Sequence, residues 1–396
     1  MTVLSREQHP ISRKSFSSAG LKVLYRLRSK GYWAFLVGGA VRDLLDDRPP
    51  RDFDVVTSAQ IPEILEIFAH SRSIGKRYPI VHVYFRGETI EITSLKNVVP
   101  EDRLGTLTED ATRRDFTVNA IYYDINDFEV VDPLNGITDL KAKLLRTIGD
   151  PIERMNEDPV RMLRALRLQL RLGFALDPAL EASIRSERAC LTEVTIGRRY
   201  EETTRLCLSS SGGALLKVCS EYGLLEHLWP QGSELMQSRG LDFFDQITSA
   251  VPVSYNRGGF DRLTHAALWL FLFLGSKIGQ TRKKSDDLEA HFKAFLGPLE
   301  MPHFFKLLVV EALQCIDGLG LCGLPKTKLG EIGNEAFRLV EAYVNCFCDN
   351  PETILDGLAP AARKNKKPRG NPNNRQSEDP QRPKRRRRRR SRQSKQ

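Results

Sequence analysis

Short apolar runs and longer amphipathic stretches divide the chain into two parts. In the first third, β-branched and aromatic residues are concentrated at Trp33–Val37, Phe53–Val56, Ile80–Phe85 and Thr89–Thr93, which is typical of strands. Ile61–Ala69 has helical spacing between them. This alternation predicts a small α/β unit.

From Asp158 onward the apolar residues recur at helical spacing along one broad face, beginning with Val160, Leu163 and Leu166. The same pattern returns at about Ala214–Leu225, Leu263–Leu274, Phe304–Leu313 and Glu335–Val344. We therefore predict an α+β protein whose α/β head is followed by an all-helical remainder.

The 396 residues are too many for one ordinary core and indicate two or three domains. The longest uncharged apolar run, Ala266–Gly275, is about half of what a membrane helix requires. The polar first residues lack the apolar region of a signal peptide. The seven cysteines are odd in number and form no CxxC motif, which fits a reducing compartment, and we expect a cytoplasmic protein with no membrane span.

Charge separates the chain again. The net charge is +10, but residues 363–396 carry 16 Lys and Arg against two acidic residues, a net of +14, so the rest sums to −4. This tail has no apolar residue except proline and is predicted to be disordered. Its six consecutive arginines, Arg385–Arg390, suit the phosphates of RNA or DNA, and a merely solubilising tail is an equal alternative.

A pair of glycines and two acidic residues carry the strongest chemical signal. Gly38 and Gly39 follow a predicted strand and precede a helical segment, an arrangement that lets backbone approach a phosphate. Asp52 and Asp54 would share one face of the next strand and could hold two magnesium ions, and Glu91 on a third strand could join them. An isolated Asp-x-Asp is more often a turn and a surface position; the glycines upstream shift the balance toward a site.

A second charged segment contains Arg113, Arg114, Asp115 and Asn119. Paired guanidinium groups suit a triphosphate or an RNA backbone, and the Asp and Asn side chains could orient a ribose. A solvated run of charges explains the segment equally well.

Two further segments follow. Asp132–Leu140 predicts a turn and a helix start that join the head to the helical part. The next helix has Asp158 as its expected N-cap, and Arg161, Arg164 and Arg167 lie near one stripe of it. An Asp and an Arg there could offer an acceptor and a donor to a base edge, although a capped helix with a basic face is the simpler interpretation.

Together these segments resemble class II nucleotidyltransferases of the polymerase β superfamily, which include bacterial poly(A) polymerases and CCA-adding enzymes. Over roughly residues 20–230, LVGGAVRDLL with RDFDVV, EDATRRDFTVNAIYYD, DPLNGITDLKAKLLR and EDPVRMLRALRL match four family motifs in order, and IGRRYEE loosely resembles a fifth. The resemblance implies a nucleotidyltransferase head with a mixed sheet. The expected parts are an N-terminal extension at 1–20, the head at 21–148, a neck at 149–230, a probable RNA-binding body at 231–362 and the tail at 363–396.

The resemblance also implies template-independent transfer of a nucleoside monophosphate to an RNA 3′ hydroxyl, with pyrophosphate released. Asp52 and Asp54 would hold two Mg²⁺ ions and Glu91 would be the third carboxylate. The implied nucleotide-binding residues are Gly38, Gly39, Arg42, Arg113, Arg114, Asp115, Asn119, Asp158, Arg161 and Arg164. RNA 3′ ends are the implied partner, with the tail as a tether.

Three features favour the poly(A) polymerase branch, with ATP as substrate. They are the stretch Gly75–Val83, the stretch Glu221–Pro230 and the basic C-terminus. Lys76, Tyr78, Pro79 and Ser94–Lys96 depart from the usual pattern of that branch. A CCA-adding tRNA nucleotidyltransferase and a non-catalytic RNA-binding protein are the alternatives.

Overall fold

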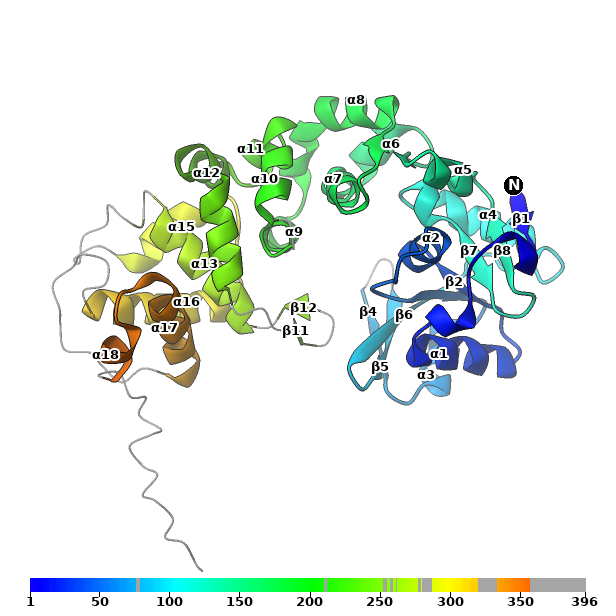
Figure 1. The fold of residues 1–396 in the computed structure, drawn as a ribbon, viewed down its shortest axis with the longest axis horizontal. Helices are drawn as coiled ribbons and strands as arrows, with labels where there is room; N and C mark the ends of the chain where they lie inside the picture. The colour runs from blue at the N-terminus through cyan, green and yellow to red at the C-terminus, as the bar shows by residue number, and fades with distance from the viewer. Residues whose placement is uncertain are drawn as a thin grey trace, which may run out of the picture.

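The computed structural model describes residues 1–75, 79–209, 212–251, 255–256, 259–260, 262–276, 279, 287–319 and 333–356. The tail at 363–396, Lys76 and Tyr78 lie outside the described residues. Figure 1 shows the head at one end of an arc of helices, with α15 to α18 at the other end. The α+β prediction is confirmed: a mixed sheet of eight strands precedes a mostly helical region.

The head is built on a single sheet with the strand order β1-β8-β7-β2-β3-β6-β5-β4. Its strands are β1 Thr2–Leu4, β2 Ala34–Val37, β3 Asp54–Thr57, β4 Ser71–Ile74, β5 Ile80–Phe85, β6 Glu88–Ser94, β7 Tyr122–Asp124 and β8 Glu129–Asp132. β3 and β6 run parallel and the other neighbours run antiparallel. The N-terminal extension thus contributes an edge strand, β1, to the sheet of the head.

Alternation along the strands fills two cores, one on each face of the sheet. On β2, Leu36 belongs to the core beneath α1 Ser18–Ser29, α2 Gly39–Leu45 and α3 Ile61–Ile67. Phe35 and Val37 belong to the opposite core, beneath α4 Arg103–Thr112. The sheet is therefore held between helices, and the ends of its central strands remain available for a site.

Two short helices lead from the head into the neck. The 3₁₀ helix η3 spans Thr117–Asn119, and α5 spans Gly136–Lys141. The buried Asp132 carboxylate accepts the Gly136 and Ile137 amides at 2.8 Å each, and a Cβ at Gly136 would collide with the Thr117 carbonyl. This packing fixes the start of α5, and the joining role of Asp132–Leu140 stays a prediction.

The remaining helices share one continuous core that runs from the neck through the body. They are α6 Pro151–Glu157, α7 Val160–Leu172, α8 Pro178–Ser186, η4 Arg188–Glu193, α9 Ile196–Cys207, α10 Gly212–Glu221, α11 Leu225–Leu228, α12 Pro230–Ala250, α13 Arg262–Gly275, α15 Leu288–Leu296, α16 His303–Gly318, α17 Asn334–Phe347 and α18 Pro351–Asp356. The strand pairs β9 Leu144–Leu145 with β10 Ala175–Leu176, and β11 Tyr255–Asn256 with β12 Gly259–Phe260, complete the described elements. No described helix is both long and apolar enough to cross a membrane.

Candidate active site

The glycine turn lies directly against one of the predicted carboxylates. β2 ends at Val37, and Gly38 follows with φ 76°, a left-handed conformation that favours glycine. A Cβ at Gly38 would lie 3.4 Å from the Asp54 Oδ2 atom. The register explains this proximity, since Val37 pairs with Asp54 across the antiparallel β2–β3 ladder.

The strand placement of the carboxylates differs from the prediction in one respect. β3 begins at Asp54, so Asp52 precedes the strand and alternation does not fix the direction of its side chain. Phe53 between them is buried and packs against Phe16 with ring centroids 5.9 Å apart, and this contact fixes the backbone just before β3. Glu91 is the register partner of Asp54 on the parallel strand β6. The structure therefore places Asp54 and Glu91 side by side, with Asp52 exposed just ahead of them.

The electrostatics of Asp54 are unusual for a carboxylate. Burial, followed by the negative charge of Glu91, raises the pKa of Asp54 from 3.8 to about 7, and Asp52 adds to this. The positive charges of Arg114 and Arg164 only partly offset the effect. The site thus brings three carboxyl groups together, and the nearby arginines do not fully balance their negative charge; we call Asp54 undercompensated in this sense.

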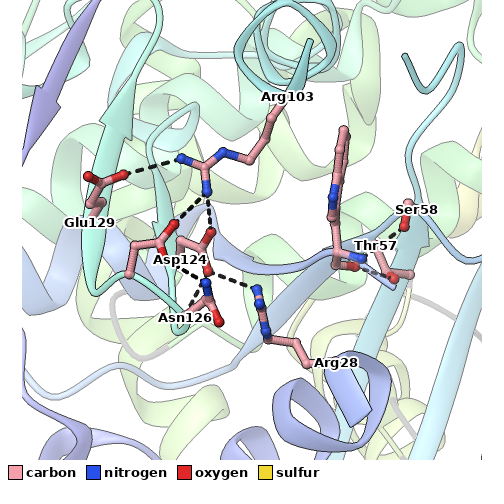
Figure 2. A network of polar contacts seen from close by, with 9 residues as sticks. Arg28, Thr57, Ser58, Arg103, Asp124, Asn126 and Glu129 are labelled. Atoms are coloured by element: carbon pink, nitrogen blue, oxygen red, sulfur yellow. Dashed lines mark hydrogen bonds and ion pairs between the residues drawn. The ribbon is translucent and has the colours of Figure 1, made fainter. Parts of the chain in front are cut away.

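Other buried carboxylates of the head provide an internal comparison. Figure 2 shows the case of Asp124, at the opposite end of the central strands, which accepts from Arg103 at 2.7 Å, Arg28 at 3.3 Å and the Asn126 amide at 2.7 Å. The buried carboxylates with donors of this kind are Asp43, Asp110, Asp115, Asp124, Asp132 and Asp139. Asp54 has no such partner among the described residues, which is the state expected of a group that binds a cation.

The donor set fits magnesium in its chemistry. Mg²⁺ takes hard oxygen ligands and is commonly bound by one or two carboxylates together with substrate phosphates. Asp54 and Asp52 offer two such carboxylates, and no cluster of three or more His, Cys, Asp or Glu side chains in the described part of the chain is arranged as a metal site on its own. Glu91 has a competing partner, because its Oε1 lies 3.1 Å from the Nε2 atom of the buried His82.

Arg42, predicted to hold phosphates, is almost completely buried and fully engaged. Its Nε and Nη2 atoms donate to Asp43 Oδ1 at 2.9 and 2.6 Å, and its Nη1 donates to Asn119 Oδ1 at 2.5 Å. A Cβ at Gly39 would lie 3.3 Å from Arg42 Nη2, so the second glycine leaves room for this guanidinium. In this structure the Arg42 guanidinium packs against the turn at Gly38 and Gly39 and stabilises it.

The two arginines at 113 and 114 are held differently. Arg113 forms an ion pair with Glu109 one helical turn earlier on α4, and both side chains are more than a third exposed. Arg114 donates to Asp110 Oδ2 at 2.9 and 3.0 Å and to the Tyr122 hydroxyl at 3.1 Å. Arg113 can therefore exchange its partner for a ligand, whereas Arg114 is fixed.

Asp115 lies at the point where the head meets α7. Its Oδ1 accepts the Phe116 amide at 2.8 Å and the Asn119 side-chain amide at 3.2 Å, and its Oδ2 lies 2.7 Å from Arg164 Nη2. The structure thus brings Arg42, Asn119, Asp115 and Arg164 into one connected set, which their spacing in sequence did not indicate.

The predicted N-cap at Asp158 is wrong. The helix α7 begins at Val160, no side-chain cap bond is formed, and only the Asp158 carbonyl accepts from the Arg161 amide, at 3.0 Å. The Asp158 carboxylate lies 3.0 Å from Arg198 on α9 instead, because an ion pair with a guanidinium outcompetes the cap. Its direction is therefore fixed by the neck.

Arg161 is buried at the start of α7. It donates to the Arg154 carbonyl at 2.7 Å and to Glu157 Oε2 at 2.8 Å, and hydrogen bonding to Arg161 lowers the pKa of Glu157. Sequence reasoning missed Glu157, Arg198 and Asp43. Each lies within a quoted motif, but its partner could be identified only from the fold.

Comparison with known proteins shows that the chain belongs to the class II nucleotidyltransferases, the family of poly(A) polymerases and CCA-adding enzymes. A model of the "Poly A polymerase head domain" matches residues 34–146. A second model, "Probable RNA and SrmB- binding site of polymerase A", matches residues 173–236.

Individual relatives come from both branches. The chain is 37% identical over 270 residues to poly(A) polymerase I of Escherichia coli O157:H7, covering 63% of this chain and 58% of that protein. It is 33% identical to poly(A) polymerase I of Haemophilus influenzae over 288 residues, covering 68% of this chain and 64% of that protein. The CCA-adding enzyme of Lactobacillus helveticus is 38% identical over 195 residues, covering 47% of this chain and 49% of that protein. The chain thus spans less than two thirds of the length of these relatives.

Solved structures share the fold over a longer range. The Bacillus stearothermophilus CCA-adding enzyme in complex with CTP superposes with a TM-score of 0.57 at 25% identity, covering 88% of this chain and 82% of that one. The Thermotoga maritima CCA-adding enzyme complexed with tRNA has a TM-score of 0.54 at 18% identity, covering 90% and 85%.

Proposed function

We propose that this protein is a poly(A) polymerase that transfers AMP from ATP to RNA 3′ ends and releases pyrophosphate. The observation that carries the chemistry is the undercompensated carboxylate of Asp54 beside Glu91 and Asp52. The adenylating branch is favoured because matches to poly(A) polymerase I extend over 270 to 288 residues, against 195 to 230 for the CCA-adding enzymes.

In the proposed mechanism, Asp52 and Asp54 hold two magnesium ions and Glu91 lies beside them. Ions held there would supply Lewis acidity at the attacking 3′ oxygen and positive charge beside the triphosphate and the leaving pyrophosphate. Asp54 must lose its proton to act as a ligand, and its pKa of about 7 makes that loss possible near neutral pH.

The remaining residues of the site bind and orient the nucleotide. Gly38 and Gly39 bring backbone close to the phosphates, and Arg113 and Arg114 supply positive charge there. Asp115 and Asn119 face the ribose, held by Arg42 and Arg164. Asp158 and Arg161 read the base edge, since both are held by neighbours in fixed directions.

Binding of RNA is assigned to the helical neck and body, with residues 363–396 as a tether. The positive charge of that tail, +14, suits a polyanion. An enzyme that uses ATP and RNA 3′ ends works where both are abundant, and we place this one in the cytoplasm.

Single-nucleotide assays test the proposal. Purified protein with Mg²⁺, a short RNA and ATP alone is expected to form long tails, and CTP alone is not expected to extend the RNA. Addition that stops after CCA on a truncated tRNA would support the CCA-adding alternative instead.

Catalytic variants separate an enzyme from a non-catalytic RNA-binding protein. Asp52→Ala and Asp54→Ala should abolish transfer and leave RNA binding intact. Asp46→Ala, which removes a partly exposed carboxylate paired with Arg48 at 2.7 Å, is the matched control and should retain transfer. Absence of transfer in the unmodified protein with every nucleotide would favour the RNA-binding alternative.

A further inference from the structure

A closed ring of six polar side chains connects the glycine turn to the neck helix α7. It comprises Arg164, Asp115, Asn119, Arg42, Asp43 and Arg171, and we call it the α7 ring. Each member is linked to the next by a contact between 2.5 and 3.2 Å, and the helix itself joins the two ends. Two members, Asp43 and Arg171, have no assigned role in binding or catalysis.

The ring begins and ends on the same helix. Arg164 and Arg171 are seven residues apart on α7, which is about two helical turns and about 10 Å, so they lie on one face. Between them the ring passes through η3 and α2, both of which belong to the head. The neck helix α7 therefore contacts the head at two points, through Arg164 at Asp115 and through Arg171 at Asp43.

The Asp43 end is as completely bonded as the Asp115 end. Asp43 is buried; its Oδ1 accepts from Arg42, and its Oδ2 lies 2.7 Å from Arg171 Nη2. Residue 171 is 128 positions from residue 43, so this is a tertiary contact and not a local pairing. The Arg171 side chain is 34% exposed; partial burial lowers its pKa, and the positive charge of Arg42 acts in the same direction, while Asp43 opposes both.

The position of Arg42 depends on this contact. Asp43 Oδ1 holds the Arg42 Nε and Nη2 atoms, and Arg42 Nη1 then reaches Asn119. Removal of Arg171 would leave Asp43 with one cation and free its carboxylate to rotate. Such a rotation would move Arg42, and with it the turn at Gly39 that lies directly over the guanidinium.

We propose that Arg171 and Asp43 are positioning residues for nucleotide transfer. Their contact fixes α7, which carries Arg161 and Arg164, against the glycine turn, so that base reading and phosphate binding keep one geometry. This inference rests on the proposed function, because it assigns the ring a role in that reaction.

Arg171→Gln is the central variant, with Arg171→Lys as the conservative one. The matched control is Arg185→Gln, which removes an exposed guanidinium from α8 that pairs with Glu181 at 3.1 Å. Hydrogen–deuterium exchange of residues 39–45 and 117–119 is measured without substrate, and kcat and KM are measured with ATP, CTP and RNA. Arg171→Gln should exchange faster in both segments, lose about tenfold in kcat with ATP and keep its KM for RNA, and Arg171→Lys should recover part of the loss.

The outcomes separate the inference from the function on which it rests. If the unmodified protein transfers no nucleotide, the proposed function fails, and unchanged exchange in Arg171→Gln would independently overturn the structural coupling. A lower kcat with unchanged exchange would also overturn the inference, because Arg171 would then act on substrate directly. Faster exchange with unchanged kcat would overturn it as well, since the ring would then be structural only.

Discussion

Replacing Asp54 with Asn should make the metal-free protein more stable at alkaline pH while it abolishes transfer. The folded protein holds the pKa of Asp54 at about 7 against an ordinary value of 3.8, chiefly through burial. A raised carboxyl pKa adds stability only while the group is protonated, so this stability is lost as the pH rises from about 4 through 7. The Asn side chain has nearly the same shape and carries no charge.

The size of the effect follows from the shift. The raised pKa of Asp54, about three units above its ordinary value, should lower the free energy of unfolding by ~4 kcal/mol at pH 8, at 1.36 kcal/mol per unit. Because Asp54 is partly exposed, this figure is an upper bound. At pH 5.5 the same linkage predicts a loss of stability of only ~2 kcal/mol, because Asp54 is then still mostly protonated in the folded protein. The advantage of Asp54→Asn over the unmodified protein should therefore roughly double between pH 5.5 and pH 8.

A probe confined to the head is required, because the helical neck and body have a large core of their own, which Phe116, Val118, Leu140 and Leu145 of the head join. Trp33 is the one tryptophan of the head among the three in the chain, and its backbone bonds to Thr57 and Ser58 beside β3. Urea unfolding followed by the ¹⁹F resonance of 5-fluorotryptophan at position 33, in EDTA, reports the free energy of unfolding of the head.

Two controls accompany this measurement. Asp46→Asn, which replaces a partly exposed carboxylate 2.7 Å from Arg48, should not be stabilised at pH 8. Added Mg²⁺ should stabilise the unmodified protein at pH 8 and leave Asp54→Asn unchanged. A loss of stability in Asp54→Asn at pH 8, or a gain independent of pH, would refute the argument that Asp54 is undercompensated.

Three further predictions follow from other parts of the molecule. Gly38→Ala places a side chain at φ 76° and should cost about 1 kcal/mol in the free energy of unfolding of the head, measured by the same urea titration; an unchanged value would contradict the strain. Arg198→Gln removes the partner of Asp158 and should lower the preference for ATP over CTP several-fold in single-nucleotide assays, whereas equal preference in both proteins would show that Asp158 is held by other contacts. Deletion of residues 363–396 should preserve transfer on saturating RNA and reduce the slope of log affinity against log salt by ~0.7 for every RNA phosphate that the tail neutralises; identical slopes would exclude the tail as the tether.

Much of the fold could be predicted because burial follows the periodicity of the elements. The strand predicted at Ile80–Phe85 has the same bounds in the structure, and the helix predicted at Leu263–Leu274 is α13. The strands β7 and β8 escaped prediction because each is short and ends in a buried aspartate, so their pattern is not purely apolar. The helix α4 is not predicted from the sequence for a similar reason: its buried face includes the polar residues Thr106 and Asp110, so the apolar pattern is interrupted.

The sequence predicts candidate site residues but not the contacts that they make. The motifs identify Asp54, Arg42 and Asp158, yet each has its environment decided by residues that are distant in sequence. Arg42 shows this most clearly. An arginine in such a motif is expected to bind phosphate, but here it is buried and donates to Asp43 and Asn119. One sequence cannot reveal such pairings, since any of its many carboxylates could have been the partner.

The two branches of the family differ in which base they accept, and we propose that Asp158 and Arg161 take part in that choice. Both side chains have partners in the neck: Asp158 pairs with Arg198 of α9, and Arg161 donates to Glu157 and to the Arg154 carbonyl of α6. If Asp158 and Arg161 read the base as proposed, base choice depends on how α6 and α9 pack around α7 and not on these two residues alone. If so, changes in the neck that leave Asp158 and Arg161 untouched should alter nucleotide preference, while changes in the carboxylate cluster at Asp54 should alter the rate for all nucleotides equally.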